Sequence, residues 1–165
     1  MAITVHALGA CKIKVDTGAS HALEDLGYSD DGVQVEERGM YHDIPGDQNG
    51  GEGGVPIEKQ YLGEFHIVRF TLTSFDKLIL PKVTTRIYGG TAGTMGTPGT
   101  LMSSNCFRLL LWTPQVSAVS TSRNYLVAMP IDSIPHNRGA KATRYSMVFA
   151  CYPNSTNVIY NAVDS

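Results

Sequence analysis

The chain has few charged residues and no long apolar run. Charged side chains occupy 17% of its 165 positions, whereas about 25% is usual in soluble proteins. The net charge of −2 is too small for a protein that holds nucleic acid by neutralising phosphates. No apolar stretch approaches the roughly 20 residues that a membrane span needs, and residues 1–6 lack the basic region of a signal peptide. Because the apolar share is 42%, a disordered chain is also excluded, and we expect one soluble domain over residues 1–165.

Spacings typical of metal sites are missing too. No CxxC or HxxxH occurs, and the histidines stand singly along the chain (His6, His21, His42, His66 and His136). We therefore expect no metal and no other cofactor. Cys106 and Cys151 lie in apolar runs and are expected to be buried thiols. Cys11 lies near the N-terminus, where we expect an exposed thiol that forms an intermolecular disulfide once the environment becomes oxidising.

The charges that are present are separated along the chain. From Glu24 to Glu64, eleven acids stand against two bases, a net charge of −9. From Phe65 to Ser165, nine bases stand against three acids, a net charge of +6. One interpretation is a solvated acidic loop. The other is a pair of complementary faces that meet in an assembly, or an acidic face turned toward something anionic.

Alternation of polar and apolar residues predicts a mainly β fold. The clearest strand is Tyr61–Thr73, in which Val68, Phe70 and Leu72 share one face. Further strands are predicted at Cys11–Val15, Val33–Glu36, Cys106–Trp112, Tyr125–Ile131 and Tyr145–Tyr152. Between Asp43 and Glu58, glycine and proline predict a loop or a long hairpin tip. This order predicts a β-sandwich or β-barrel with one short flanking helix.

The single helix is predicted directly after the clearest strand. Thr73 or Ser74 is the expected N-cap of a helix over Phe75–Leu80, with Asp76 in its first turn. Pro81 lacks an N–H donor, so we expect a kink or an early stop there. A turn-rich loop is predicted next, because glycines recur at intervals of three (Gly90, Gly93, Gly96 and Gly99).

One short motif has a catalytic interpretation. Asp16-Thr17-Gly18-Ala19-Ser20 resembles the signature of retropepsin-like aspartic proteases, in which two aspartates share a proton and activate water. A homodimer would supply the second aspartate. The same five residues also form a good turn, since Asp, Thr and Ser can bond to the local backbone. The sequence leaves both interpretations open.

A longer resemblance covers roughly residues 10–115. The pattern of strand, acidic Gly/Pro loop, strand and capped helix resembles tail tube proteins of contractile-tailed bacteriophages. It runs through Asp31–Gly39, Asp43–Asp47, Gly50–Glu58, Gln60–Glu64 and Arg69–Lys77. The resemblance implies a β-sandwich or barrel with a flanking helix. It further implies that six subunits form a ring around a lumen, that rings stack, and that a long loop reaches the neighbouring ring.

The resemblance also implies which residues carry the assembly. The loop from Tyr41 to Gln60 is the candidate inter-ring contact, with Tyr41, Asp43, Pro45, Asp47, Asn49, Glu52, Pro56 and Glu58 at the interface. The lumen of such tubes is acidic, which keeps passing DNA unbound. The lumen candidates are Glu36, Glu37, Asp47, Glu52 and Glu58.

The function implied is that of a virion structural protein without enzymatic activity. The partners implied are further copies of the chain, the tail sheath protein, baseplate and neck proteins, and passing DNA that is not specifically bound. No membrane is implied. The location implied is the virion tail, after assembly in the host cytoplasm. The alternatives are a tube initiator or terminator in the baseplate or neck, and the dimeric protease built on Asp16.

Overall fold

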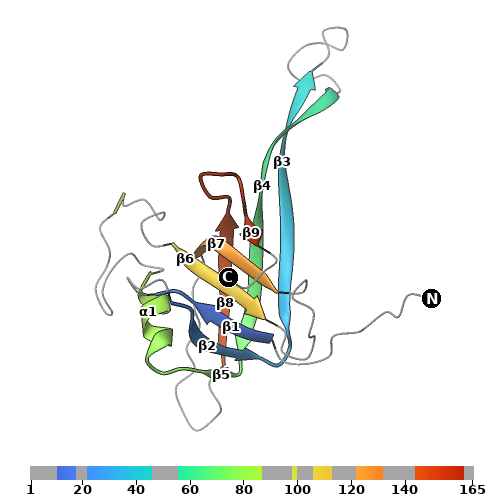
Figure 1. Cartoon of the computed structure of the whole chain (residues 1–165). Coiled ribbons are helices and arrows are strands. Elements are labelled where there is room, and N and C mark those ends of the chain that lie inside the picture. The colour runs from blue at the N-terminus through green and yellow to red at the C-terminus, as the bar shows by residue number, and fades with distance from the viewer. Residues whose placement is uncertain are drawn as a thin grey trace, which may run out of the picture.

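The computed structural model describes residues 11–17, 22–45, 56–86, 98–99, 106–112, 122–131 and 144–161. Within these ranges the chain is mainly β, with one short helix (Figure 1). The elements are β1 (Cys11–Val15), β2 (Glu24–Ser29), β3 (Val33–Pro45), β4 (Pro56–Leu72), β5 (Ser74–Phe75), α1 (Ile79–Arg86), β6 (Phe107–Trp112), β7 (Arg123–Pro130), β8 (Tyr145–Tyr152) and β9 (Tyr160–Asn161). The predicted mainly β fold with one short helix is confirmed.

The strands form one antiparallel sheet that curls back on itself. Its order is β3-β4-β8-β7-β6-β1-β2-β5, and β9 pairs with β7. Strand β5 follows β4 after the single residue Thr73 and pairs with β2. The last strand in this order, β5, is therefore the continuation of β4, the second strand in the order. The Thr73 amide donates to the Tyr28 carbonyl and the Asp76 amide to the Leu26 carbonyl, each at 2.9 Å. The sheet therefore closes into a barrel.

The barrel is filled by the inward faces of its strands. On β4, Val68, Phe70 and Leu72 are buried as their alternation predicts, while the residues between them are half-buried. Phe149 of β8 stacks on Phe70 with the ring centroids 5.5 Å apart, and Phe107 of β6 meets the edge of Phe149 at 5.5 Å. Such aromatic pairs add to the stability that burial of apolar area supplies.

The helix begins later than the sequence suggests. The Asp76 carboxylate accepts hydrogen bonds from the amides of Leu78 at 2.6 Å and Ile79 at 3.2 Å, so Asp76 is the cap, and the prediction of Thr73 or Ser74 is wrong. Pro81 is the third residue of α1, and the helix continues past it to Arg86. The expected early stop at Pro81 is therefore wrong. The buried face of α1 packs near β2 and β7, at the end of the barrel away from the projecting ends of β3 and β4 (Figure 1).

The hairpin of β3 and β4 extends beyond the barrel. Strand β4 pairs with β8 only from His66 to Leu72, whereas it pairs with β3 back to Pro56. We call the projecting part, Arg38–Pro45 with Pro56–Phe65, the arm (Figure 1). The predicted loop from Tyr41 to Gln60 is therefore strand at both of its ends, and its residues 46–55 lie outside the described residues. Its prolines, Pro45 and Pro56, oppose each other at the end of the pairing, a position that a strand tolerates.

The cysteines differ in part from expectation. Cys151 is fully buried, as expected, and burial raises the pKa of its thiol well above the ordinary range. Cys106 is half-buried. Cys11 is only 7% exposed, because it is on the inward face of β1 with Ile13 and Val15. The expected exposure of Cys11 is thus wrong, and an intermolecular disulfide through Cys11 would require β1 to move.

Candidate assembly surface

The arm carries large apolar side chains that are open to solvent. Met40 is 46%, Tyr41 60%, Tyr61 55% and Leu62 59% exposed. Tyr41 and Tyr61 are directly opposite each other across the two strands, with their rings tilted at 60° and the centroids 5.7 Å apart. Apolar side chains gathered on one projecting element are typical of a protein–protein contact.

At the root of the arm, where β3 and β4 leave the barrel, oppositely charged side chains pair on the outer face. The Glu36 carboxylate accepts hydrogen bonds from Arg38 and from Arg69 of β4, both at 2.7 Å. The bonds from Arg38 and then Arg69 lower the pKa of Glu36 to about 2. These are exposed pairs, so they contribute little stability, and only the Glu36–Arg69 pair joins β3 to β4.

The opposite face at the root carries a second cluster, here called the root cluster: Glu37, His66, Arg123, Tyr125 and Tyr160. Arg123 of β7 donates to the Glu37 carboxylate at 2.9 Å and to the Tyr125 hydroxyl at 3.4 Å. Its guanidinium also lies over the Tyr160 ring, 4.8 Å from the centroid. Arg123 thus ties the arm strand β3 to the barrel strands β7 and β9. The hydrogen bond from Arg123 is the main cause that lowers the pKa of Glu37.

His66 is the buried member of the root cluster. Its Nδ1 lies 3.3 Å from the Tyr125 hydroxyl, and its ring contacts those of Tyr125 and Tyr160 at centroid distances of 5.8 and 5.7 Å. Burial is the main cause that lowers the pKa of His66, and the positive charge of Arg123 acts in the same direction. The negative charges of Glu37 and Glu64 act to raise the pKa of His66, but the pKa still lies below its ordinary value.

The root cluster makes the stability of the fold dependent on pH. The unfolded chain binds a proton at His66 below pH about 6.5, whereas the folded chain does not until a lower pH. Stability is therefore full above pH 6.5 and is lost as the pH falls toward the folded pKa, by at most about 1.4 kcal/mol per pH unit. We expect the thermal midpoint of the wild type to fall between pH 7.5 and 5 more steeply than that of His66→Gln.

The control for this prediction is His42→Gln, because His42 is an exposed histidine of the arm. That variant should follow the wild-type profile. Parallel profiles of the wild type and His66→Gln, measured by circular dichroism, would show that protonation of His66 does not oppose folding.

Of the lumen candidates, Glu36 and Glu37 are not on the same face of β3. Glu36 and Glu37 are neighbours on β3 and bond to arginines on opposite faces of the strand, so at most one of them can face a lumen. Glu58 is exposed on the arm. Asp47 and Glu52 lie outside the described residues. The acidic lumen stays a prediction.

The acidic and basic halves of the sequence meet within the one chain. Among the described residues, four ion pairs join the segment 24–64 to the segment 65–165: Glu24–Lys82, Asp31–Arg144, Glu36–Arg69 and Glu37–Arg123. Part of the charge complementarity that the sequence suggested for an assembly is therefore used inside the subunit.

The candidate inter-ring residues that the structure describes lie on the arm. Asp43 pairs with Lys59 at 3.5 Å, and Glu58 opposes Ile44. Asn49, like Asp47 and Glu52, is outside the described residues. Sequence reasoning missed Met40, Tyr61 and Leu62 as surface residues. The signal was present as two apolar pairs, Met40-Tyr41 and Tyr61-Leu62, on either side of the polar Gly/Pro stretch.

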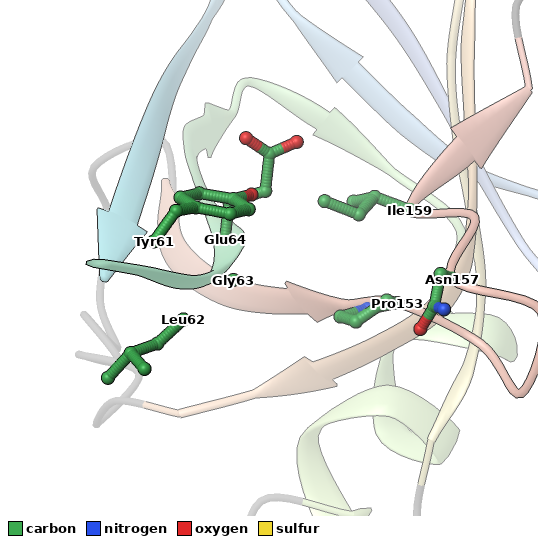
Figure 2. A pocket seen from close by; sticks show the side chains of 7 residues that line it. All are labelled: Tyr61, Leu62, Gly63, Glu64, Pro153, Asn157 and Ile159. Carbon is green, nitrogen blue, oxygen red and sulfur yellow. The ribbon is translucent and has the colours of Figure 1, made fainter. Parts of the chain in front are cut away.

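A groove lies beside the root of the arm, where β8 leaves β4. Pro153 follows β8, and the chain then turns through Asn157 and Ile159 toward β9. The gap between this turn and β4 has a volume of about 430 Å³ and is lined by Tyr61, Leu62, Gly63, Glu64, Pro153, Asn157 and Ile159. Figure 2 shows Tyr61 and Glu64 on one side of the β4 ribbon and Leu62 on the other. Pro153 and Ile159 contribute apolar surface to the groove, and Asn157 and Glu64 contribute polar groups.

Asp16 of the protease-like motif stands at the end of β1. Its side chain is buried, and its amide donates to the Arg108 carbonyl of β6 at 3.1 Å. The Thr17 hydroxyl donates to Glu24 at 2.7 Å. Gly18, Ala19 and Ser20 lie outside the described residues.

Among the described residues, no group of three or more His, Cys, Asp or Glu side chains could hold a metal ion. No helix in the described ranges is long and apolar enough to cross a membrane.

Comparisons with known proteins add little. No protein-family model matches the chain, and no curated protein matches it. Among solved structures, the chain is similar to one titled "Crystal structure of Hcp protein", with 9% sequence identity and a TM-score of 0.36 over 92% of this chain and 96% of that chain. A similarity of this size carries no argument about what this chain does.

Proposed function

We propose that the chain is a virion structural protein, a tail tube subunit that assembles into stacked hexameric rings. The stack would form the DNA-conducting channel inside a contractile sheath. The proposal rests on the sequence pattern from Asp31 to Lys77 and on one structural observation. The arm extends past the barrel and exposes Met40, Tyr41, Tyr61 and Leu62.

The physical argument concerns the arm alone. A two-stranded ribbon is only marginally stable in water, and strand edges without partners invite pairing with another chain. Along the arm, β4 has no partner other than β3 among the described strands. A neighbouring copy that covers the ribbon would bury its apolar side chains and stabilise its pairing. Repetition of that contact from subunit to subunit, and so from ring to ring, would give an extended assembly.

The finer parts of the proposal follow the family resemblance. Sheath, baseplate and neck proteins are the proposed partners, the virion tail is the proposed location, and DNA passes without being specifically bound. No catalysis is proposed, and the burial of Asp16 supports a structural role for the Asp-Thr-Gly-Ala-Ser segment. A tube initiator or terminator would share this fold and differ only in the faces that bind.

Sedimentation velocity of the purified chain over a range of concentrations tests the proposal. A tube subunit should give a hexamer-sized species and larger stacks that grow with concentration. A hexamer that never grows would favour the initiator or terminator. A monomer at every concentration would contradict the proposed function.

A further inference from the structure

The groove and the start of α1 lie at opposite ends of the barrel. The groove borders Tyr61–Glu64 of β4, and the stretch Phe65–Leu72 that follows spans roughly 25 Å at about 3.3 Å per residue. Strand β5 and the turn at Lys77–Leu78 come after it, at the α1 end of the barrel (Figure 1). Two surfaces at opposite ends of one subunit can meet only between different copies.

The Lys77–Leu78 turn is an unusually open apolar and basic surface. Leu78 is 78% exposed, more than any other large apolar side chain among the described residues. The turn is held in place because the Leu78 amide donates to the Asp76 carboxylate at 2.6 Å. Lys77 is exposed, and no described carboxylate lies within 4.0 Å of its ammonium group.

The groove is complementary to this turn in both respects. Ile159 and Pro153 supply apolar walls, and Glu64 supplies the negative charge (Figure 2). Loss of solvent and the nearby charge of Glu64 raise the pKa of Tyr61, so the Glu64 carboxylate lies close enough to the Tyr61 phenol to act on it. The volume of about 430 Å³ leaves room for a leucine side chain and the end of a lysine.

We propose that the Lys77–Leu78 turn of one copy seats in the groove of the next, with Leu78 against Ile159 and Pro153 and Lys77 paired with Glu64. The contact is head-to-tail, so it can repeat from copy to copy, and repetition along one axis would build a stack. It rests on the proposed function, and it names a stacking contact of the barrel ends that is separate from the arm.

A charge exchange tests this contact. Lys77→Glu and Glu64→Lys should each weaken stacking at least ten-fold, because each places like charges together. The double variant Lys77→Glu/Glu64→Lys should restore stacking to within about three-fold of the wild type, since the charges again match. Both residues are exposed, so the thermal midpoint should stay unchanged, and stacking is measured by sedimentation velocity.

The outcomes separate this contact from the proposed function. Stacks that form equally well in both single variants would overturn the contact and leave the tube subunit standing. Single variants that fail without rescue in the double variant would also overturn the pairing of Lys77 with Glu64. A wild type that stays monomeric would contradict the proposed function itself, and the contact with it.

Discussion

Replacement of both Met40 and Tyr41 by threonine is expected to abolish assembly while the barrel stays folded. These side chains are about half exposed or more, so the folded subunit loses little when they are shortened. Threonine keeps the strand preference of the arm. Residues that anchor an interface typically contribute about 2 kcal/mol or more each. The loss of each one therefore weakens the contact roughly 30-fold. Because every subunit repeats the contact, we expect the assembled species to disappear at concentrations where the wild type assembles.

The matched control is Ile131→Thr, which shortens an apolar side chain that is 47% exposed and lies just past the end of β7, outside the arm. It should assemble as the wild type does. Equal assembly of the arm variant and the control in sedimentation velocity would show that the arm is not the contact.

Gly27→Ala is expected to destabilise the fold more than any single surface change. Gly27 lies where β2 pairs with both β1 and β5, and its φ is +156°. A Cβ there would overlap the Ser74 carbonyl oxygen and lie 2.9 Å from the Phe75 Cα. Both obstacles are backbone atoms of β5, the strand that closes the barrel. Backbone strain and overpacking together cost about 4 kcal/mol, and we expect the thermal midpoint to fall by about 10 °C.

Gly63→Ala provides the comparison for this prediction. Its φ is +141°, close to that of Gly27, but a Cβ there would meet only the end of the Met40 side chain at 3.8 Å. It should therefore cost only the backbone strain, about 1–2 kcal/mol. If the two alanine variants melted at the same temperature, steric closure of the barrel at Gly27 would be refuted.

Local patterns predicted those parts of the fold that local rules decide. The alternation at Cys11–Val15 and around Val68, Phe70 and Leu72 gave the correct faces, because the period of two is fixed by the strand itself. Exposure of Cys11 was predicted from its place in the sequence rather than from this alternation, and the alternation was the better guide. The cap at Asp76 was missed in favour of Thr73 and Ser74, since all three residue types serve as caps.

The arm could be predicted only in part. Glycines and prolines between Asp43 and Glu58 indicated a loop, and they concealed the strand pairing that continues to Pro45 and Pro56. The pairing depends on register across the hairpin, which composition does not encode.

The root cluster was beyond prediction for a similar reason. Glu37, His66, Arg123 and Tyr160 come from four strands far apart in the sequence. A lone histidine and a pair of adjacent acids gave no sign that they meet. The ion pairs between the acidic and basic segments likewise arise from strand order, and the charge segregation of the sequence indicated only that partners of opposite sign exist.

Electron microscopy of the concentrated, purified chain tests the central claim most directly. The account predicts rings of six subunits around an open lumen, stacked into tubes, with density for the arm between neighbouring subunits. Particles that stay single and monomer-sized, or an assembly in which the arm contacts no neighbour, would contradict it.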